Sequence, residues 1–141
     1  MQRLQLNHAD LSFSRLVYGV WRLADDADLS TKHVRAKIDA ALAEGITTFD
    51  HADIYGNHEC EALFGKALAE DAGLRKKMEL VTKCDICMAT DKFPERRVGF
   101  YDTSAAYINA QVEQSLRNFH TDVIDTLLIH RPDPLMDAAG T

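Results

Sequence analysis

Residues 45–56 read GITTFDHADIYG, a run that passes from a helix stop through a strand to chemically reactive side chains. A glycine opens the run, and Ile46 to Phe49 are β-favouring residues that suit a short buried strand. The reactive side chains that follow are Asp50, His51, Asp53 and Tyr55. Parallel α/β folds place their sites where a buried strand ends, because the strand is rigid there and the loop is free to vary. The run therefore predicts a functional site at the end of this strand.

Two later apolar runs end on reactive residues in the same way. Leu80-Val81-Thr82 leads into Lys83, and Leu127-Leu128-Ile129 leads into His130. Three successive strand ends thus offer an aspartate with a tyrosine, a lysine, and a histidine. Because parallel strands end at one edge of a sheet, the pattern predicts that these side chains meet.

The N-terminal part of the chain predicts a hairpin and a first core strand. Apolar residues from Leu4 to Phe13 flank the turn-rich segment 7–10, which is typical of a β-hairpin. Leu16-Val17-Tyr18 suits a buried strand, and Gly19-Val20-Trp21 follows it directly. A glycine at a strand end lets a ligand approach the backbone closely.

The rest of the chain alternates helices with strands. We expect a helix capped within Asp28–Thr31 and ended by Gly45, a second from about Glu59, and a third capped by Thr103 or Ser104. The strands expected between and after these helices are Ile46–Phe49, Met78–Thr82, and Val123-Ile124 with Leu127–Ile129. Residues 84–102 show no period and predict a long loop beside the site. The order βα, βα, βα, β predicts an α/β fold with a parallel sheet and right-handed crossovers.

Composition excludes several classes of function. The chain has 141 residues, of which 46% are apolar and 27% charged, as is ordinary for a globular domain. A net charge of −6 argues against binding to a nucleic acid backbone. We expect no membrane span, since no apolar run approaches the roughly 20 residues that one needs. Residues 1–5 lack a signal-peptide core, so a cytoplasmic setting is expected.

The three cysteines predict free thiols. Cys84 and Cys87 have the spacing of a redox pair, and His58 with Cys60 invites a zinc interpretation. A thioredoxin-type pair opens a helix, however, whereas this pair follows a strand. A structural zinc site usually shows a second pair of ligands at defined spacing. We therefore expect neither a disulfide nor a metal site.

Asp50, Tyr55, Lys83 and His130 resemble, in order and spacing, the active-site residues of the aldo-keto reductases. The phrases DHADIYG (residues 50–56) and IHRP (residues 129–132) look most like the bacterial branch of that family. The resemblance covers the whole chain, and the chain covers about the first half of such an enzyme. It implies the N-terminal half of a (β/α)8 TIM barrel preceded by a β-hairpin, with residues 1–141 as one partial barrel domain and the second half absent.

The resemblance also implies a reaction. The family reduces aldehydes or ketones to alcohols with a nicotinamide cofactor, for which NADPH is the expected form. The resemblance assigns the general acid to Tyr55, assisted by Lys83, Asp50 and His130. It assigns cofactor contacts to Gly19, Val20, Trp21 and Asp50, and a small carbonyl compound as substrate.

Structural explanations exist for each residue alone. Asp50 is also typical of a turn that leaves a strand, and Tyr55 of a ring packed on a barrel rim. Lys83 also suits a solvated strand end, and His130 a buried histidine with satisfied hydrogen bonds. His51 and Asp53 have no role in the family and are expected to be loop structure. Arg131 departs from the aromatic residue that many family members carry there.

The alternative function is a half-barrel fragment without catalytic activity, or a regulatory family member. Four strands leave open barrel edges, so self-association is also expected.

Overall fold

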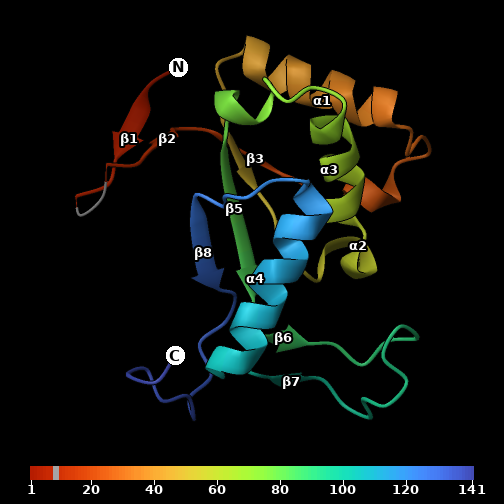
Figure 1. Ribbon diagram of the computed structural model, residues 1–141, viewed down its shortest axis with the longest axis vertical. Coiled ribbons are helices and arrows are strands. Elements are labelled where there is room, and N and C mark those ends of the chain that lie inside the picture. Colours follow the sequence, from red (N-terminus) through yellow and green to blue (C-terminus); the bar gives the residue numbers. More distant parts are fainter. Residues whose placement is uncertain (8–9) are drawn as a thin grey trace.

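The computed structural model describes residues 1–7 and 10–141, in an α/β arrangement (Figure 1). Part of the predicted hairpin turn, at residues 8–9, lies outside the described residues. The strands are β1 (Arg3–Gln5), β2 (Ser12–Ser14), β3 (Val17–Gly19), β4 (Thr48–Asp50), β5 (Glu79–Cys84), β6 (Ile86–Cys87), β7 (Phe100–Tyr101) and β8 (Thr126–Ile129). The helices are η1 (Leu23–Asp25), α1 (Thr31–Ala43), α2 (Tyr55–His58), α3 (Cys60–Ala69), η2 (Arg75–Lys77) and α4 (Ala105–Phe119).

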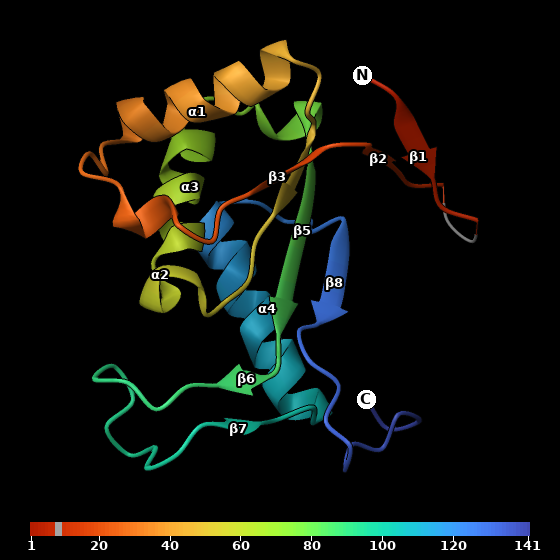
Figure 2. The same ribbon diagram turned by 180° about the vertical axis from the view of Figure 1, so that it is seen from behind.

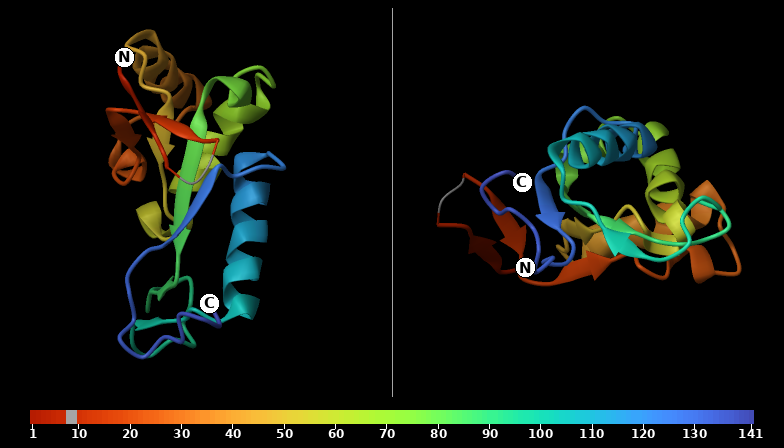
Figure 3. Two further views of the ribbon diagram at one scale, coloured as in Figure 1. Left: turned by 90° about the vertical axis from the view of Figure 1, so that its left-hand side faces the viewer. Right: turned by 90° about the horizontal axis from the view of Figure 1, so that it is seen from below.

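The central sheet has four parallel strands in the order β3-β4-β5-β8. Each crossover carries a helix, so the strand order follows the sequence order, as in successive βα units. Seen from below in Figure 3, α1, α3 and α4 form an arc outside the strands. The predicted sequence of units is therefore present, and the curved sheet with an outer helix layer is the geometry of half a barrel.

Local signals explain where the helices begin and end. The hydroxyl of Ser30 accepts a hydrogen bond from the backbone N–H of His33, and Ser104 does the same for Tyr107. Gly45 closes α1 in the left-handed region at φ +75°, which a glycine adopts without steric cost. Both predicted caps and the predicted glycine stop are confirmed.

Four predicted strand boundaries were wrong by a few residues. The first strand starts at Val17 rather than Leu16, since the Leu16 carbonyl accepts from the Ser14 hydroxyl. The second starts at Thr48, because the Ile46 N–H is still bonded to Ala41 of the preceding helix. The third strand extends to Cys84 and so includes Lys83 within it. Val123 and Ile124 lie outside β8, where the Val123 carbonyl is held by Arg75.

The segment 84–102, predicted as an unstructured loop, contains a short hairpin. Strands β6 and β7 pair antiparallel, with Ile86 opposite Tyr101 and Cys87 opposite Phe100. We call residues 88–99, which join them, the strap. Figure 2 shows the strap at the same end of the molecule as the arrowhead of β5. The predicted segment thus lies at the carboxyl edge of the sheet.

The core lies between the sheet and the helices. It is built around rings and branched side chains that are fully buried, among them Phe49, Phe64, Phe119, Ile38 and Leu80. On α4 the predicted apolar stripe is only partly buried, since Phe119 and Ser115 are buried while Ile108, Val112 and Leu116 are half-buried.

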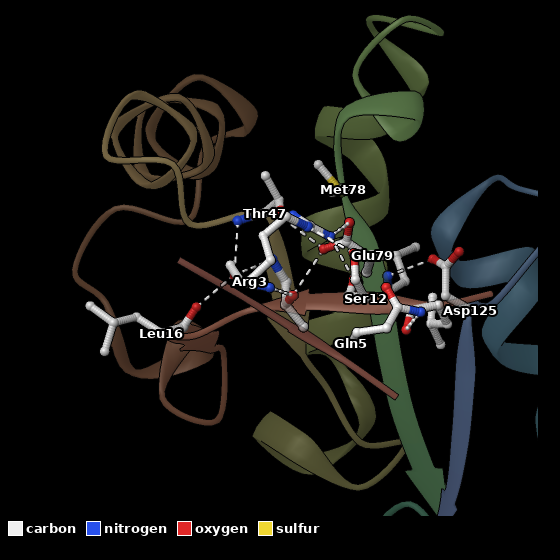
Figure 4. Close-up of polar contacts among 12 residues, drawn as sticks. Arg3, Gln5, Ser12, Leu16, Thr47, Met78, Glu79 and Asp125 are labelled. Carbon is white, nitrogen blue, oxygen red and sulfur yellow. Dashed lines mark hydrogen bonds and ion pairs between the residues drawn. The ribbon is translucent and has the colours of Figure 1, made fainter. Parts of the chain in front are cut away.

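A polar network fixes the N-terminal hairpin to the starting ends of the central strands (Figure 4). The Arg3 guanidinium donates to the Thr47 hydroxyl at 2.8 Å and lies 2.6 Å from a Glu79 carboxylate oxygen. Glu79 also accepts from the hydroxyls of Thr47 and Thr48. These bonds place the hairpin at the amino edge of the sheet, away from the strand ends that carry the candidate site.

Candidate active site

Parallel pairing brings the predicted residues to one edge. Asp50 is the last residue of β4 and pairs with Gly19 on one side and Val81 on the other. Lys83 lies near the end of β5, and His130 directly follows β8, its N–H donating to the Cys84 carbonyl at 3.0 Å. All three residues therefore stand at the carboxyl edge of neighbouring strands.

The Lys83 ammonium lies at the centre of this group and is mostly shielded from solvent. It donates to the Asp50 carboxylate at 2.8 Å, to the His51 carbonyl at 2.7 Å and to the Tyr55 hydroxyl at 3.1 Å. It also lies 4.9 Å from the centroid of the Tyr55 ring. Three acceptors use all three N–H bonds of an ammonium, so its direction is fixed. The lysine therefore holds a fixed positive charge at hydrogen-bonding distance from the Tyr55 hydroxyl.

A sharp turn after β4 brings Tyr55 to the lysine. Gly56 and Asn57 take left-handed backbone angles, φ +59° and +53°, which bend the chain after the tyrosine. A Cβ at position 56 would come within 2.5 Å of the Ala24 side chain and 2.6 Å of the Cys60 sulfur. Only glycine meets both demands at no cost, so Gly56 sets the position of the preceding phenol.

His130 stands across from the tyrosine. The two rings meet edge to face with centroids 5.8 Å apart. Burial, and then the positive charges of Lys83 and Arg131, lower the pKa of His130 below its ordinary value. The imidazole is thus neutral near pH 7 and carries one N–H to offer to a substrate oxygen.

The predicted cofactor residues lie beside Asp50. The Val20 N–H donates to the Asp50 carbonyl at 3.1 Å, and Val20 itself is buried. Trp21 is 67% exposed, and a Cβ at Gly19 would meet no atom within 4 Å. A backbone without a side chain therefore borders open space at Gly19, which pairs with Asp50, and an exposed indole follows two residues later. That arrangement fits a flat ring such as a nicotinamide.

His51 and Asp53 lie in the loop between β4 and α2, as predicted. Both are buried, His51 completely, and the His51 ring packs edge-on against Phe64 and Phe119 at 4.5 and 4.7 Å. Burial, and then the charge of Lys83, lower the pKa of His51 to about 3. The burial of His51 could have been predicted from the sequence, because successive side chains of an extended chain point to opposite faces. His51 follows Asp50, which faces the site, so its side chain points to the helices.

Burial sets the chemistry of the three cysteines. All three are buried and free. Burial, and then the nearby carboxyl groups, raise the pKa of Cys84 to about 12, and burial also raises the pKa of Cys60 and of Cys87. Raised pKa values oppose the thiolate that redox chemistry needs. Across residues 1–7 and 10–141, no three His, Cys, Asp or Glu side chains are grouped to hold a metal ion.

The fold is half of a parallel α/β barrel, and its carboxyl edge carries a cluster of Asp, Tyr, Lys and His side chains. These two features are those of a barrel enzyme, and comparison with known sequences gives the family. Residues 15–139 match the Aldo/keto reductase family. The chain belongs to the aldo-keto reductase family, as its resemblance predicted.

Individual relatives agree with that assignment. The chain is 55% identical over 141 residues to a 6-dehydroglucose reductase of Agrobacterium fabrum, covering 100% of this chain and 47% of that protein. It is 54% identical over 140 residues to the uncharacterized oxidoreductase YcsN of Bacillus subtilis, covering 99% of this chain and 46% of that protein. The chain thus spans about half the length of the curated relatives it matches.

Solved structures confirm the fold. The holo form of the aldo-keto reductase AKR11C1 from Bacillus halodurans matches with a TM-score of 0.71 and 31% identity, over 90% of this chain and 39% of that one. The glycerol dehydrogenase AKR11B4 from Gluconobacter oxydans matches with a TM-score of 0.76 and 31% identity, over 95% and 40%. The predicted half of a TIM barrel is therefore confirmed.

In the part of the chain that the structure describes, no helix has the length and apolar character needed to cross a bilayer.

Proposed function

We propose that this protein is an oxidoreductase of the aldo-keto reductase type, which reduces aldehydes or ketones to alcohols with NADPH. The observation that carries the proposal is the Lys83 ammonium, 3.1 Å from the Tyr55 hydroxyl and 2.8 Å from the Asp50 carboxylate. The names of two relatives, a reductase and a dehydrogenase, support the same class of reaction.

Tyr55 is the proton donor in this proposal. A free phenol has a pKa of about 10, so it exchanges protons poorly at neutral pH without help. Lys83 supplies a positive charge at hydrogen-bonding distance, and Asp50 keeps that charge in place. The phenol can then give its proton to a developing alkoxide and be left as a stabilised phenolate.

His130 positions the substrate. Its neutral ring stands edge to face with the Tyr55 ring, on the same side of the strand ends. An N–H from His130 and the hydroxyl of Tyr55 can converge on one carbonyl oxygen. Two donors at one oxygen orient the carbonyl carbon and favour the charge that forms on the oxygen.

Gly19, Val20, Trp21 and Asp50 are the residues proposed to hold the nicotinamide end of the cofactor. The open space at Gly19 and the exposed Trp21 ring fit that role. When bound, the nicotinamide supplies the hydride. The preference for NADPH over NADH, a cytoplasmic setting and a small carbonyl substrate are parts of the same proposal.

The test is a titration of the purified protein with NADPH and NADH, followed by assay with small aldehydes and ketones. Tyr55→Phe is expected to lower carbonyl reduction by about 10²- to 10⁴-fold while cofactor affinity stays unchanged, because the lost hydroxyl acts only in the transition state. Tyr18→Phe removes a phenol outside the site and serves as the matched control. Equal activity in Tyr55→Phe and the parent would contradict the assignment.

A second candidate function is a half barrel that carries these side chains without catalysing reduction, either as a fragment or as a regulatory family member. The chain spans 47% and 46% of the length of the two curated relatives. This candidate predicts no measurable affinity for either dinucleotide. The NADPH titration above therefore separates the two candidates.

A further inference from the structure

A second polar pocket lies on the helix side of the sheet, between α3 and α4 and beside the strap. It has a volume of about 450 Å³. Its lining includes Asp53, His58, Glu61, Phe93, Gln111 and Asn118. Helices α3 and α4 pack against each other, and Figure 1 shows α4 in front of β5 with α3 above its upper end. We call this space the α3–α4 pocket.

The α3–α4 pocket is separate from the candidate active site. The Thr82 hydroxyl donates to Glu61 of the pocket at 2.6 Å, whereas the next residue, Lys83, points to Asp50 and Tyr55. Successive residues of a strand point to opposite faces of the sheet. The pocket and the Lys83 cluster are therefore on opposite sides of β5.

The two carboxylates of the pocket differ in how they are satisfied. Glu61 is buried and accepts from the side chains of Thr82, Ser115 and Asn118 at 2.6, 2.9 and 3.0 Å. It ties β5, α3 and α4 together and needs no further partner. Asp53 is 6% exposed, and among the described residues neither of its carboxylate oxygens has a hydrogen-bond partner. The Nε2 atom of His58 is likewise buried and unpartnered in the described part of the chain.

An unpartnered buried carboxylate costs stability, so its presence calls for a ligand that donates hydrogen bonds. The basic side chains around the pocket have other contacts. Arg117 pairs with Glu113, Lys92 pairs with Glu59, and Arg96 stacks at 3.8 Å on the Phe93 ring. A metal ion lacks enough ligands, since no suitable group of three lies in the described residues. A group with several N–H bonds and a positive charge matches what remains.

We propose that the α3–α4 pocket binds a small organic cation with an amino or guanidinium group, whose N–H bonds pair with the Asp53 carboxylate. His58 and the amide side chains of Gln111 and Asn118 supply further polar contacts around the ligand. The proposal does not depend on the proposed reductase activity.

The charge on Asp53 makes binding depend on pH. Burial, and then the charges of Glu61 and Asp85, raise the pKa of Asp53 to about 7, against the opposing effects of the Ile54 amide and Arg96. A cation binds the ionised carboxylate, so affinity for a guanidinium is expected to rise as pH increases through 7. The neighbouring His58 has a lowered pKa and stays neutral over this range.

The test compares two probes of the same shape, the methylguanidinium ion and neutral N-methylurea. Each is titrated at millimolar concentration into the ¹⁵N-labelled protein, and the side-chain amide signals of Gln111, Gln114 and Asn118 report on the pocket. We expect saturable shifts with methylguanidinium and about tenfold weaker binding of N-methylurea, because a charged hydrogen bond is lost. An equal response to both probes would overturn the proposal, as would the absence of a saturable shift.

Three variants complete the test. Asp53→Asn keeps the shape of the side chain and is expected to weaken methylguanidinium binding about tenfold and to remove its pH dependence. Asp122→Asn removes the same charge at an exposed position outside the α3–α4 pocket and is expected to bind like the parent. Gln111→Leu places an apolar side chain in the lining, leaves Asp53 unchanged and is expected to weaken methylguanidinium binding independently. Unchanged binding in a folded Asp53→Asn variant would overturn the proposal.

Discussion

Lys83 connects the parts of the candidate site, because its ammonium contacts the Asp50 carboxylate, the His51 carbonyl and the Tyr55 hydroxyl. Replacing it by methionine keeps the length of the side chain and removes the charge. We expect Lys83→Met to lower carbonyl reduction by about 10²-fold or more, since the phenol then lacks its cationic partner. Steady-state kinetics across pH measure the effect. Lys32→Met, at an exposed position on α1, is the control, and a rate like the parent's in Lys83→Met would contradict the role.

A substitution at Gly19 tests cofactor binding without changing the stability of the fold. An alanine Cβ there meets no protein atom within 4 Å, and the residue does not take a left-handed backbone angle. We expect Gly19→Ala to unfold at the same urea concentration as the parent but to bind NADPH at least about tenfold more weakly, because the methyl group occupies the proposed nicotinamide space. Urea denaturation and a fluorescence titration with NADPH measure the two effects. A loss of stability without a loss of affinity would argue against the placement.

Asp53 is expected to reduce stability at neutral pH. Its folded-state pKa of about 7 exceeds the ordinary 3.8, so the folded protein binds the proton more tightly than the unfolded chain does. The free energy of unfolding therefore falls as pH rises from about 4 to 7. We expect Asp53→Asn to be more stable than the parent by roughly 2–4 kcal/mol at pH 8, and the difference to vanish below pH 4. Chemical denaturation at both pH values measures this, and a less stable variant at pH 8 would contradict the argument.

At the scale of elements, the crossing of α3 and α4 depends on one glycine. A Cβ at Gly65 would lie 1.8 Å from the Asn118 carbonyl oxygen, which belongs to the backbone and has no side chain to move aside. Gly65→Ala must therefore push the two helices apart, at a cost of about 1–3 kcal/mol or more. Urea denaturation measures the change. Gly99→Ala is the control, since its nearest contact is an ordinary 3.7 Å, and equal stability of the two variants would contradict the packing argument.

The hairpin and the strap lie at opposite ends of the sheet, and each is held there by its own contacts. Arg3 binds Thr47, which directly precedes β4, and Glu79, which begins β5, so the hairpin closes the amino edge. The strap follows the far end of β5 and contacts α2, where the Phe93 ring packs on His58 with centroids 5.0 Å apart. One end of the sheet is thus fixed by polar bonds, and the carboxyl edge remains available for a site.

At the scale of the whole molecule, the outer strands are open. Val17 of β3 and Leu128 of β8 are 48% and 42% exposed, whereas Phe49 and Leu80 of the two central strands are fully buried. Exposed apolar edge strands pair readily with other chains. We expect the chain to self-associate, with sedimentation velocity giving species larger than the monomer. Leu128→Lys should shift the distribution toward monomer, while Val98→Lys, on the exposed strap, should not. A stable monomer of the parent chain would contradict this prediction.

The sequence by itself determined the order of the parallel strands and their connecting helices, the helix caps and the residues of the candidate site, but not the β6–β7 hairpin. These features depend on local rules, since Ser30, Ser104 and Gly45 act within a few residues of their own positions. The placing of Asp50, Lys83 and His130 at one edge followed from the polarity of parallel strands. Resemblance added the barrel, which no local pattern specifies.

Only the tertiary structure decided what surrounds those residues. Strand ends shifted because hydrogen bonds from distant partners override local preference, as Arg75 does for the carbonyl of Val123. The His51 ring is buried against Phe64 of α3 and Phe119 of α4, and Asp53 lies near the Glu61 carboxylate of α3. The same packing forms the α3–α4 pocket. Its unpartnered carboxylate is a property of how three elements meet, and no single stretch of sequence contains it.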